Sequence, residues 1–126
     1  MKIIASIPAY HEKLFLDYCI RSVYDFVDGI ILTDTGMFAS LVAGFKHQST
    51  DGTHEIINKW KSDKKIYVIQ EKNEPKTFKE LMSPALNVAK ELKGDWLFHV
   101  GGDEIWPKQT LIPMRKILDG CQKNDI

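Results

Sequence analysis

Four short apolar runs alternate along this chain with longer segments whose apolar residues recur at helical spacing. The runs cover residues 2–7, 29–33, 66–70 and 95–100. Apolar runs of this length, bounded by glycine, proline or polar residues, are typical of strands that are buried on both faces. Strands that alternate with helices predict a parallel sheet with helices packed on both of its faces.

The intervening segments predict the helices. Residues 11–26, 54–60 and 78–92 each place apolar side chains along one helical face. Pro107 opens a last helical segment, which Pro113 is expected to interrupt because an internal proline removes a backbone hydrogen bond. Pro84 lies inside the third of these segments and fits best in the first turn of a helix, so that helix is expected to begin near it.

Residues 37–48 fit a lid, a short helix or an obstruction equally well, because their middle is apolar without a clear period. The chain has 126 residues and contains no internal repeat, low-complexity tract or linker, which predicts one domain over residues 1–126. No apolar run approaches the ~20 residues that a transmembrane helix needs, and the first ten residues lack the apolar core of a signal peptide.

Charge and cysteine content narrow the class of partner. The 17 basic residues balance the 17 acidic ones, so the chain lacks the basic excess expected of a nucleic-acid-binding protein. Cys19 and Cys121 belong to no CxxC pair and no His/Cys cluster, which favours reduced thiols over a zinc site. Reduced thiols and the absence of a leader predict a cytoplasmic protein.

Acidic residues and glycines follow the predicted strands at residues 8–12, 34–36 and 101–104. Ligands of open parallel sheets bind at the carboxyl ends of the strands, so these positions are the candidate site. Carboxylates there suit ribose hydroxyls, base N–H groups or a divalent cation. The chain contains neither GxGxxG nor GxxxxGK[ST], and it has no GxSxG, so dinucleotide, P-loop and acyl-hydrolase sites are disfavoured.

Three segments resemble family 2 glycosyltransferases. Residues 8–12 (PAYHE) are similar to the PxYNE opening of that family. Residues 31–36 (ILTDTG), rejoined to residues 49–53 (STDGT), resemble its DxGSTDGT segment. Residues 94–104 (GDWLFHVGGDE) resemble its GDWxxxxDxDE segment, which holds the DxD metal motif, and the three segments occur in family order.

This resemblance implies a Rossmann-like GT-A fold, a three-layer α/β sandwich with a mostly parallel sheet, here cut short after the DxD region. The chain would be the N-terminal portion that binds a nucleoside-diphosphate sugar. The resemblance further implies transfer of the sugar to an unidentified acceptor, whose hydroxyl attacks the anomeric carbon with inversion and with the help of a carboxylate base.

The family's site residues can be placed on matching positions of this chain. The resemblance implies nucleotide binding by Pro8, Ala9, Tyr10, Glu12, Asp34 and Thr35. It implies that Asp103 and Glu104 hold Mn²⁺ or Mg²⁺ at the diphosphate, where the ion would act as a Lewis acid. Gly102 and Trp106 are candidate sugar contacts, Trp106 because an indole can stack on a sugar ring.

The departures from the family pattern support an alternative. His11 replaces the usual Asn, and Gly101 replaces the first Asp of the DxD. The family's catalytic base lies well downstream of the DxD, and this chain ends 22 residues after Glu104, so the catalytic residue is unknown. The alternative is a non-catalytic nucleotide-binding or assembly module. A homodimer that covers the exposed edge of the sheet is the assembly it predicts.

Simpler interpretations apply to several of these residues. Asp34 could cap a turn, and Asp103 with Glu104 could form a solvated turn. Asp51 is expected to be a helix N-cap. His99, inside a predicted strand, is expected to be a packed core histidine. A dinucleotide oxidoreductase is the most distant alternative, since the glycine pattern is missing.

Overall fold

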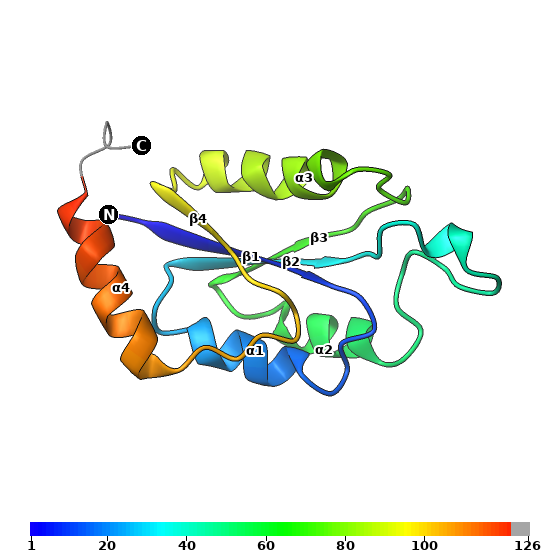
Figure 1. The fold of residues 1–126 in the computed structure, drawn as a ribbon, viewed down its shortest axis with the longest axis horizontal. Coiled ribbons are helices and arrows are strands. Elements are labelled where there is room, and N and C mark those ends of the chain that lie inside the picture. The colour runs from blue at the N-terminus through cyan, green and yellow to red at the C-terminus, as the bar shows by residue number, and fades with distance from the viewer. Residues whose placement is uncertain (122–126) are drawn as a thin grey trace.

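The computed structural model describes residues 1–121 and contains a four-stranded parallel sheet with helices on both faces (Figure 1). The strands lie in the order β3-β2-β1-β4. In chain order the elements are β1 (Ile3–Ala9), α1 (Leu16–Val23), β2 (Gly29–Asp34), the 3₁₀ turn η1 (Ala39–Leu41), α2 (Thr53–Trp60), β3 (Ile66–Ile69), α3 (Phe78–Glu91), β4 (Trp96–His99) and α4 (Lys108–Gly120).

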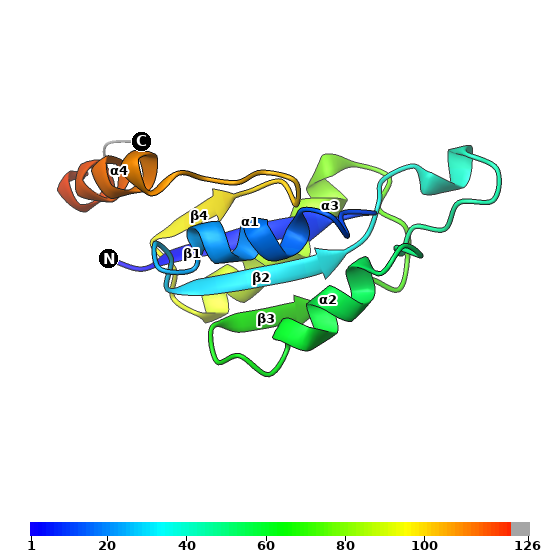
Figure 2. The ribbon, with the colours of Figure 1, turned by 90° about the horizontal axis from the view of Figure 1, so that it is seen from below.

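Both faces of the two central strands are covered, which is why their sequences are continuous apolar runs. Ile3 and Ile7 of β1 share a core cluster with Leu16 of α1, whereas Ile4 belongs to a second cluster with Ala85 of α3. Figure 2 shows α1 and α2 on one side of the sheet and α3 behind it. The predicted α/β class, with a parallel sheet between helices, is confirmed.

Strand β1 continues two residues beyond its predicted end, through Pro8 to Ala9. Alternate residues of a parallel strand turn their backbone groups to the same neighbour, and the Ser6 carbonyl accepts from Val100 on the β4 side. Pro8 therefore faces that side as well, and the β1–β4 register ends before it, at Ser6↔His99. The missing N–H of Pro8 costs no ladder bond, so the strand tolerates proline there.

Two expectations about the helices are wrong. Helix α3 begins at Phe78 rather than near Pro84, because the Thr77 hydroxyl caps it by accepting from the Glu80 amide at 3.1 Å. Helix α4 runs unbroken through Pro113. An internal proline removes one backbone bond without ending a helix when packing holds the two halves together, and buried Leu111 fixes α4 to the core on one side of the proline.

The prediction that His99 is packed in the core is also wrong. His99 is exposed, and its only ring neighbour among the described residues is Phe78, edge-on at 5.7 Å. The reason is the strand order, because β4 lies at the edge of the sheet and pairs only with β1.

Residues 37–46 form a finger that projects beyond the carboxyl end of the sheet (Figures 1 and 2). The finger is irregular apart from η1, so the short-helix interpretation holds for three residues only. The Gly36 amide donates to the His47 carbonyl at 2.7 Å and closes the base of the finger. Within residues 1–121, no helix is both long and apolar enough to cross a membrane.

Candidate functional site

The carboxyl ends of β1, β2 and β4 place the predicted site residues at one edge of the sheet. β1 ends at Ala9, and β2 ends at Asp34, which is its register partner. β4 ends at His99 and is followed directly by the segment from Gly101 to Glu104. The positions are therefore brought to one edge, as the topology requires, but they form two separate groups on either side of Tyr10.

The first group lies where β1 meets the segment after β4. Gly102 is buried against β1, and a Cβ atom added to it would lie 3.0 Å from Glu12 Cγ and 3.3 Å from Ala9 Cβ. A Cβ on Gly101 would lie 3.0 Å from carboxylate oxygens of both Asp103 and Glu104. The two glycines thus let three carboxylates gather beside the end of β1.

The pKa values of this group reflect its negative charge. Burial raises the pKa of the Glu12 carboxyl, and the carboxylates of Asp103 and Asp51 raise it further. Burial also raises the pKa of the Cys19 thiol to about 12, with added repulsion from Glu104, Asp103 and Glu12. Cys19 donates through Sγ to the Gly101 carbonyl at 3.3 Å, so it anchors the segment after β4 and is not a nucleophile.

Asp103 and Glu104 are the exposed members of the group, and their oxygens are hard donors that suit Mg²⁺ or Mn²⁺. In residues 1–121 no three His, Cys, Asp or Glu side chains lie close enough together to hold an ion by themselves. A two-carboxylate set is the kind that binds Mg²⁺ together with substrate phosphates, so the residues present fit a metal that arrives with a diphosphate.

Trp106 is tied to this group. Its indole Nε1 donates to Glu104 Oε2 at 3.0 Å, and its ring packs edge-on against Phe98 at 5.1 Å. Its backbone amide donates to the Ser22 hydroxyl of α1 at 3.1 Å. These contacts fix Glu104 beside the core. The prediction that Trp106 or Gly102 contacts a sugar stays a prediction.

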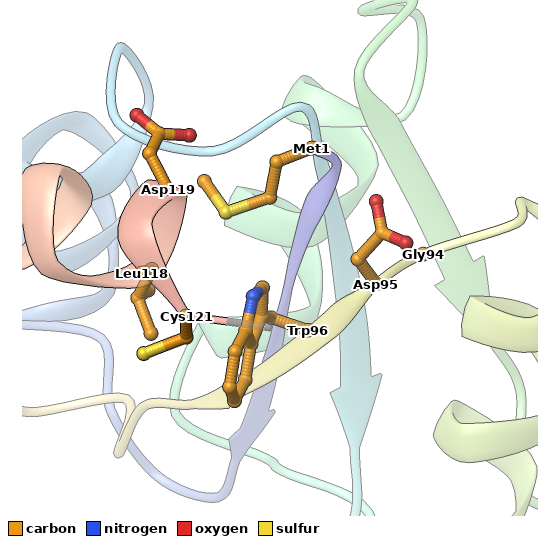
Figure 3. A pocket seen from close by; sticks show the side chains of 7 residues that line it. All are labelled: Met1, Gly94, Asp95, Trp96, Leu118, Asp119 and Cys121. Carbon is orange, nitrogen blue, oxygen red and sulfur yellow. The ribbon is translucent and has the colours of Figure 1, made fainter. Parts of the chain in front are cut away.

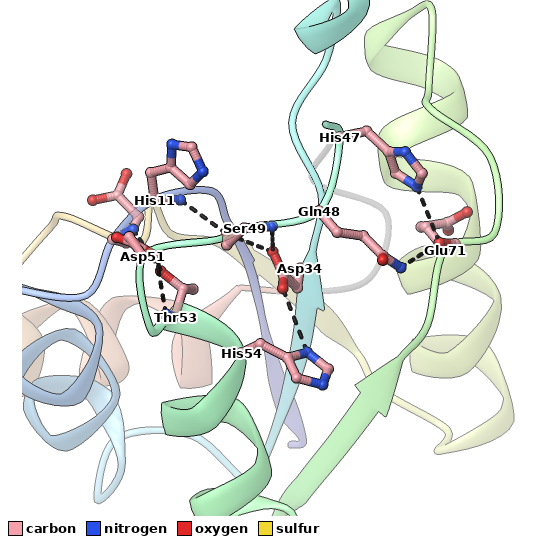
Figure 4. A network of polar contacts seen from close by, with 10 residues as sticks. His11, Asp34, His47, Gln48, Ser49, Asp51, Thr53, His54 and Glu71 are labelled. Carbon is pink, nitrogen blue, oxygen red and sulfur yellow. Dashed lines mark hydrogen bonds and ion pairs between the residues drawn. The ribbon is translucent and has the colours of Figure 1, made fainter. Parts of the chain in front are cut away.

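Asp34 centres the second group (Figure 4). Its Oδ1 accepts from both the amide and the hydroxyl of Ser49, and its Oδ2 lies 3.5 Å from His54 Nδ1. Asp34 is only 8% exposed, and Oδ2 is buried without a hydrogen bond in the described structure, as is the hydroxyl of Thr35. Buried polar atoms without a hydrogen-bond partner are rare in folded proteins.

A cavity of about 180 Å³ adjoins Asp34 at the carboxyl ends of β2 and β3. It is lined by Asp34, Gln48, His54, Ile57, Val68, Ile69 and Gln70. Apolar walls with a few convergent polar groups are typical of ligand pockets. Sequence reasoning missed Ser49, His54 and Gln70 as site residues. Ser49 had a signal in its place in the rejoined motif, whereas His54 follows that motif and Gln70 was the last residue of a predicted strand.

Tyr10 lies between the two groups and holds the finger. Its hydroxyl donates to the Lys46 carbonyl at 2.6 Å, and a Cβ on Gly36 would clash with its ring at 2.6 Å. Its ring stacks on His11, which in turn meets Phe45 of the finger at 5.8 Å. Burial raises the pKa of the Tyr10 hydroxyl, as do the charges of Glu74 and Asp34. Pro8 and Ala9 contribute the end of β1 beneath it.

The prediction that Asp51 is the N-cap of α2 is wrong by one residue, because the N-cap is Gly52. Asp51 Oδ1 accepts from both the amide and the hydroxyl of Thr53, and the Thr53 hydroxyl accepts from the Glu12 amide at 2.8 Å. This chain of bonds connects α2 to the residue that follows β1, so it positions Glu12 in the first group.

A cavity of about 620 Å³ lies at the opposite end of the sheet (Figure 3). It is lined by Met1, Gly94, Asp95, Trp96, Leu118, Asp119 and Cys121, which are the starts of β1 and β4 and the end of α4. Because parallel sheets bind ligands at the carboxyl ends of their strands, the smaller cavity beside Asp34 is the better candidate.

No protein-family model matches this chain, and no curated protein matches it in sequence. The crystal structure of S. aureus TarS 1–349 is similar to 94% of this chain, with a TM-score of 0.65 and 20% sequence identity. The chain covers 32% of that TarS chain, so it spans about a third of the structure it matches. The likeness shows that the fold is glycosyltransferase-like.

Proposed function

We propose that this chain binds a nucleoside-diphosphate sugar at the carboxyl edge of its sheet and forms the donor-binding part of an inverting family 2 glycosyltransferase. The observation that carries the proposal is the gathering of Glu12, Asp103 and Glu104 beside two glycines, at the end of β1 in a glycosyltransferase-like fold. Repulsion among these carboxylates favours a bound divalent cation.

The group around Asp34 would bind the nucleoside. The buried Oδ2 of Asp34 has no hydrogen bond within the described chain, and it is an acceptor for a base N–H or a ribose hydroxyl. The adjoining cavity offers Val68 and Ile69 as apolar walls for a base and Gln70 as a polar group for its edge. Tyr10 and Thr35 lie next to this acceptor along the ends of β1 and β2.

The group around Glu12 would bind the diphosphate. Asp103 and Glu104 would hold Mn²⁺ or Mg²⁺, which when bound supplies Lewis-acid stabilisation of the leaving diphosphate. Gly102 lets the chain pass close to Ala9, and Trp106 orients Glu104 through its indole N–H. The acceptor hydroxyl would attack the anomeric carbon with inversion, and no residue of this chain is assigned as its base.

A second candidate function is nucleotide binding without transfer. Gly101 stands where the family has the first DxD aspartate, so the proposed metal site has one carboxylate fewer than the family pattern. A site with fewer free carboxylate oxygens can still bind a nucleotide, but it holds a metal more weakly.

Calorimetric titration of the chain with UDP and with GDP, each with and without Mn²⁺, tests the proposal. We expect metal-dependent binding of one nucleotide, which Asp103→Asn abolishes and Asp119→Asn preserves, because Asp119 is an exposed carboxylate at the far end of the sheet. Binding that persists in Asp103→Asn would reject the metal assignment. A folded chain that binds neither nucleotide would reject the proposed function, and nucleotide binding that does not depend on Mn²⁺ would favour the second candidate.

A further inference from the structure

The finger, residues 37–46, exposes apolar side chains that lie outside the core of the described chain. Phe38, Leu41, Val42 and Phe45 are 44%, 78%, 53% and 50% exposed. None of them belongs to a core cluster of the described residues. Exposed hydrophobic side chains scattered singly are ordinary, but a contiguous group marks an interaction surface.

The backbone of the finger is adapted to an apolar environment. Residues 36–45 carry no charge. The amides of Leu41, Val42 and Phe45 donate to the carbonyls of Phe38, Ala39 and Val42 at 3.0–3.1 Å. Polar backbone groups are costly to bury unless they are hydrogen-bonded, and here several are satisfied within the finger itself.

The base of the finger is fixed to the body of the protein. Ser40 donates its amide to Glu74 Oε1 at 2.9 Å, and Glu74 forms an ion pair with Lys76 at 2.8 Å. Tyr10 holds the Lys46 carbonyl, as described above. Phe38 keeps a φ of 59°, a left-handed conformation that bulky residues rarely adopt. Specific contacts therefore hold the finger in a conformation that projects from the body of the protein. This conformation does not come from packing of the finger's apolar side chains in a core.

We propose that the finger inserts its apolar tip into the surface of a lipid bilayer. The tip is convex and projects from the body (Figures 1 and 2), so it fits a deformable apolar medium. It offers four exposed large apolar side chains, whereas a standard protein interface involves about 20–30 residues on each side. Lys46, exposed directly after the uncharged stretch, and the neutral Glu74–Lys76 pair at the base suit a headgroup layer.

The inference goes beyond the proposed function and does not depend on it. Gly36 follows Asp34 by two residues, so the finger rises from the same edge of the sheet as the candidate site. Insertion would turn that edge toward the bilayer. Membrane binding through a few side chains is expected to be weak and reversible. A single myristoyl chain, for comparison, binds membranes with an association constant of about 10⁴ M⁻¹.

Flotation of the full chain with phosphatidylcholine vesicles, at about millimolar lipid to match such an affinity, tests the proposal. We expect the chain to float, and we expect Leu41→Ser combined with Phe45→Ser to lower its partition into vesicles by roughly tenfold or more. The matched control is Ile112→Ser combined with Ile117→Ser on α4, which removes two equally exposed apolar side chains and leaves partition unchanged.

A second measurement places the tip directly. An environment-sensitive dye attached through Leu41→Cys, in a Cys121→Ser background that removes the exposed native thiol, is expected to shift its emission to the blue when vesicles are added. The same dye attached through Ile117→Cys should not shift. Circular dichroism of each variant tests whether the fold is retained, and nucleotide titration tests whether the proposed donor site is retained. A variant that passes both tests but no longer binds vesicles has lost only the contact made by the finger.

Four results would overturn the proposal. The first is no flotation of the wild-type chain, and the second is equal flotation of the wild type and the finger variant. The third is binding that requires anionic phosphatidylglycerol, is abolished by salt and is the same in the wild type and the finger variant. The fourth is self-association in the ultracentrifuge that depends on the finger and occurs without flotation. The last result would assign the tip to a second copy of the chain.

Discussion

Asp34 and Ser49 are joined twice, because the Ser49 amide and hydroxyl both donate to Asp34 Oδ1, at 3.0 and 2.6 Å. The pairing brings the end of β2 back to the segment that precedes α2, with the finger looped out between them. It also leaves Asp34 Oδ2 as the acceptor that faces His54 and the adjoining cavity. One oxygen of Asp34 therefore joins the end of β2 to the segment before α2, and the other lies 3.5 Å from His54 Nδ1.

Replacement of Ser49 by alanine should destabilise the protein. Ser49→Ala removes one of two donors to a buried carboxylate, and a hydrogen bond to a charged group contributes about 1.5–3 kcal/mol. We expect the free energy of unfolding, measured by urea titration, to fall by that amount. The control is Thr50→Ala, since Thr50 is exposed and has only a 3.5 Å contact with His11. Equal losses in the two variants would show that the Ser49 hydroxyl has no special role.

The raised pKa of Glu12 predicts a pH dependence of stability. A carboxyl whose folded-state pKa lies above its ordinary value of 4.5 binds its proton more tightly in the folded protein. Its contribution to stability is complete below 4.5 and is lost as the pH rises through the folded-state pKa. Glu12→Gln should therefore be more stable than the wild type near neutral pH, and this advantage should vanish below pH 4.5.

Urea titrations at the two pH values measure this difference, with Glu55→Gln on the exposed face of α2 as the control. The same advantage at both pH values would contradict the electrostatic origin. Mn²⁺ offers an independent check: if the proposed donor site is correct, the cation should stabilise the wild type more than Glu12→Gln, because it neutralises the repulsion that Glu12 feels from Asp103.

The sheet could be predicted from the sequence because both faces of β1 and β2 are covered. Continuous apolar runs are the direct consequence of that burial, and they indicate the parallel α/β class without any alignment. The prediction for His99 failed for the complementary reason. Nothing in the residues of β4 indicates that this strand lies at the edge of the sheet, and burial of its side chains depends on that position.

The candidate site was predictable in its position but not in its contacts. The topological rule brings Glu12, Asp34 and Asp103 to one edge. The hydrogen bonds between Ser49 and Asp34 form only because the chain loops out through the finger and returns beside Gly36. No hydrophobic pattern within a single segment of the sequence indicates that return. The roles of Asp103, Glu104 and Trp106 toward a metal and a sugar stay predictions, since they depend on a ligand rather than on the fold.

Glu74 is expected to control the mobility of the finger. Its hydrogen bonds with Lys76 and Ser40 lower its pKa to about 2. The tether is therefore complete above the ordinary value of 4.5 and weakens as the pH falls toward 2. Hydrogen exchange followed by mass spectrometry should show faster exchange across residues 37–46 in Glu74→Gln, with Glu91→Gln at the end of α3 as the control. Unchanged exchange in Glu74→Gln would mean that the hydrogen bonds of Tyr10 and Gly36 suffice to hold the finger.

Gly102 is expected to be the least replaceable residue of the first group. A Cβ there would lie 3.0 Å from Glu12 Cγ and 3.4 Å from Ala9 Cα. Glu12 can move, but the backbone of Ala9 is held in β1 by its pairing with Asp34 of β2, so the segment after β4 must shift outward. Overpacking of this kind costs about 1–3 kcal/mol, and we expect Gly102→Ala to lose that much stability in urea titrations.

The matched control is Gly120→Ala, because a Cβ on Gly120 meets no atom of residues 1–121 within 4 Å and should leave stability nearly unchanged. The displaced segment carries Asp103 and Glu104, so Gly102→Ala should also weaken metal-dependent nucleotide binding under conditions in which the variant remains folded. A variant that loses stability but binds nucleotide normally would separate the packing of Gly102 from the donor site. A variant that loses neither would show that Gly102 and β1 are less tightly packed than the structure describes.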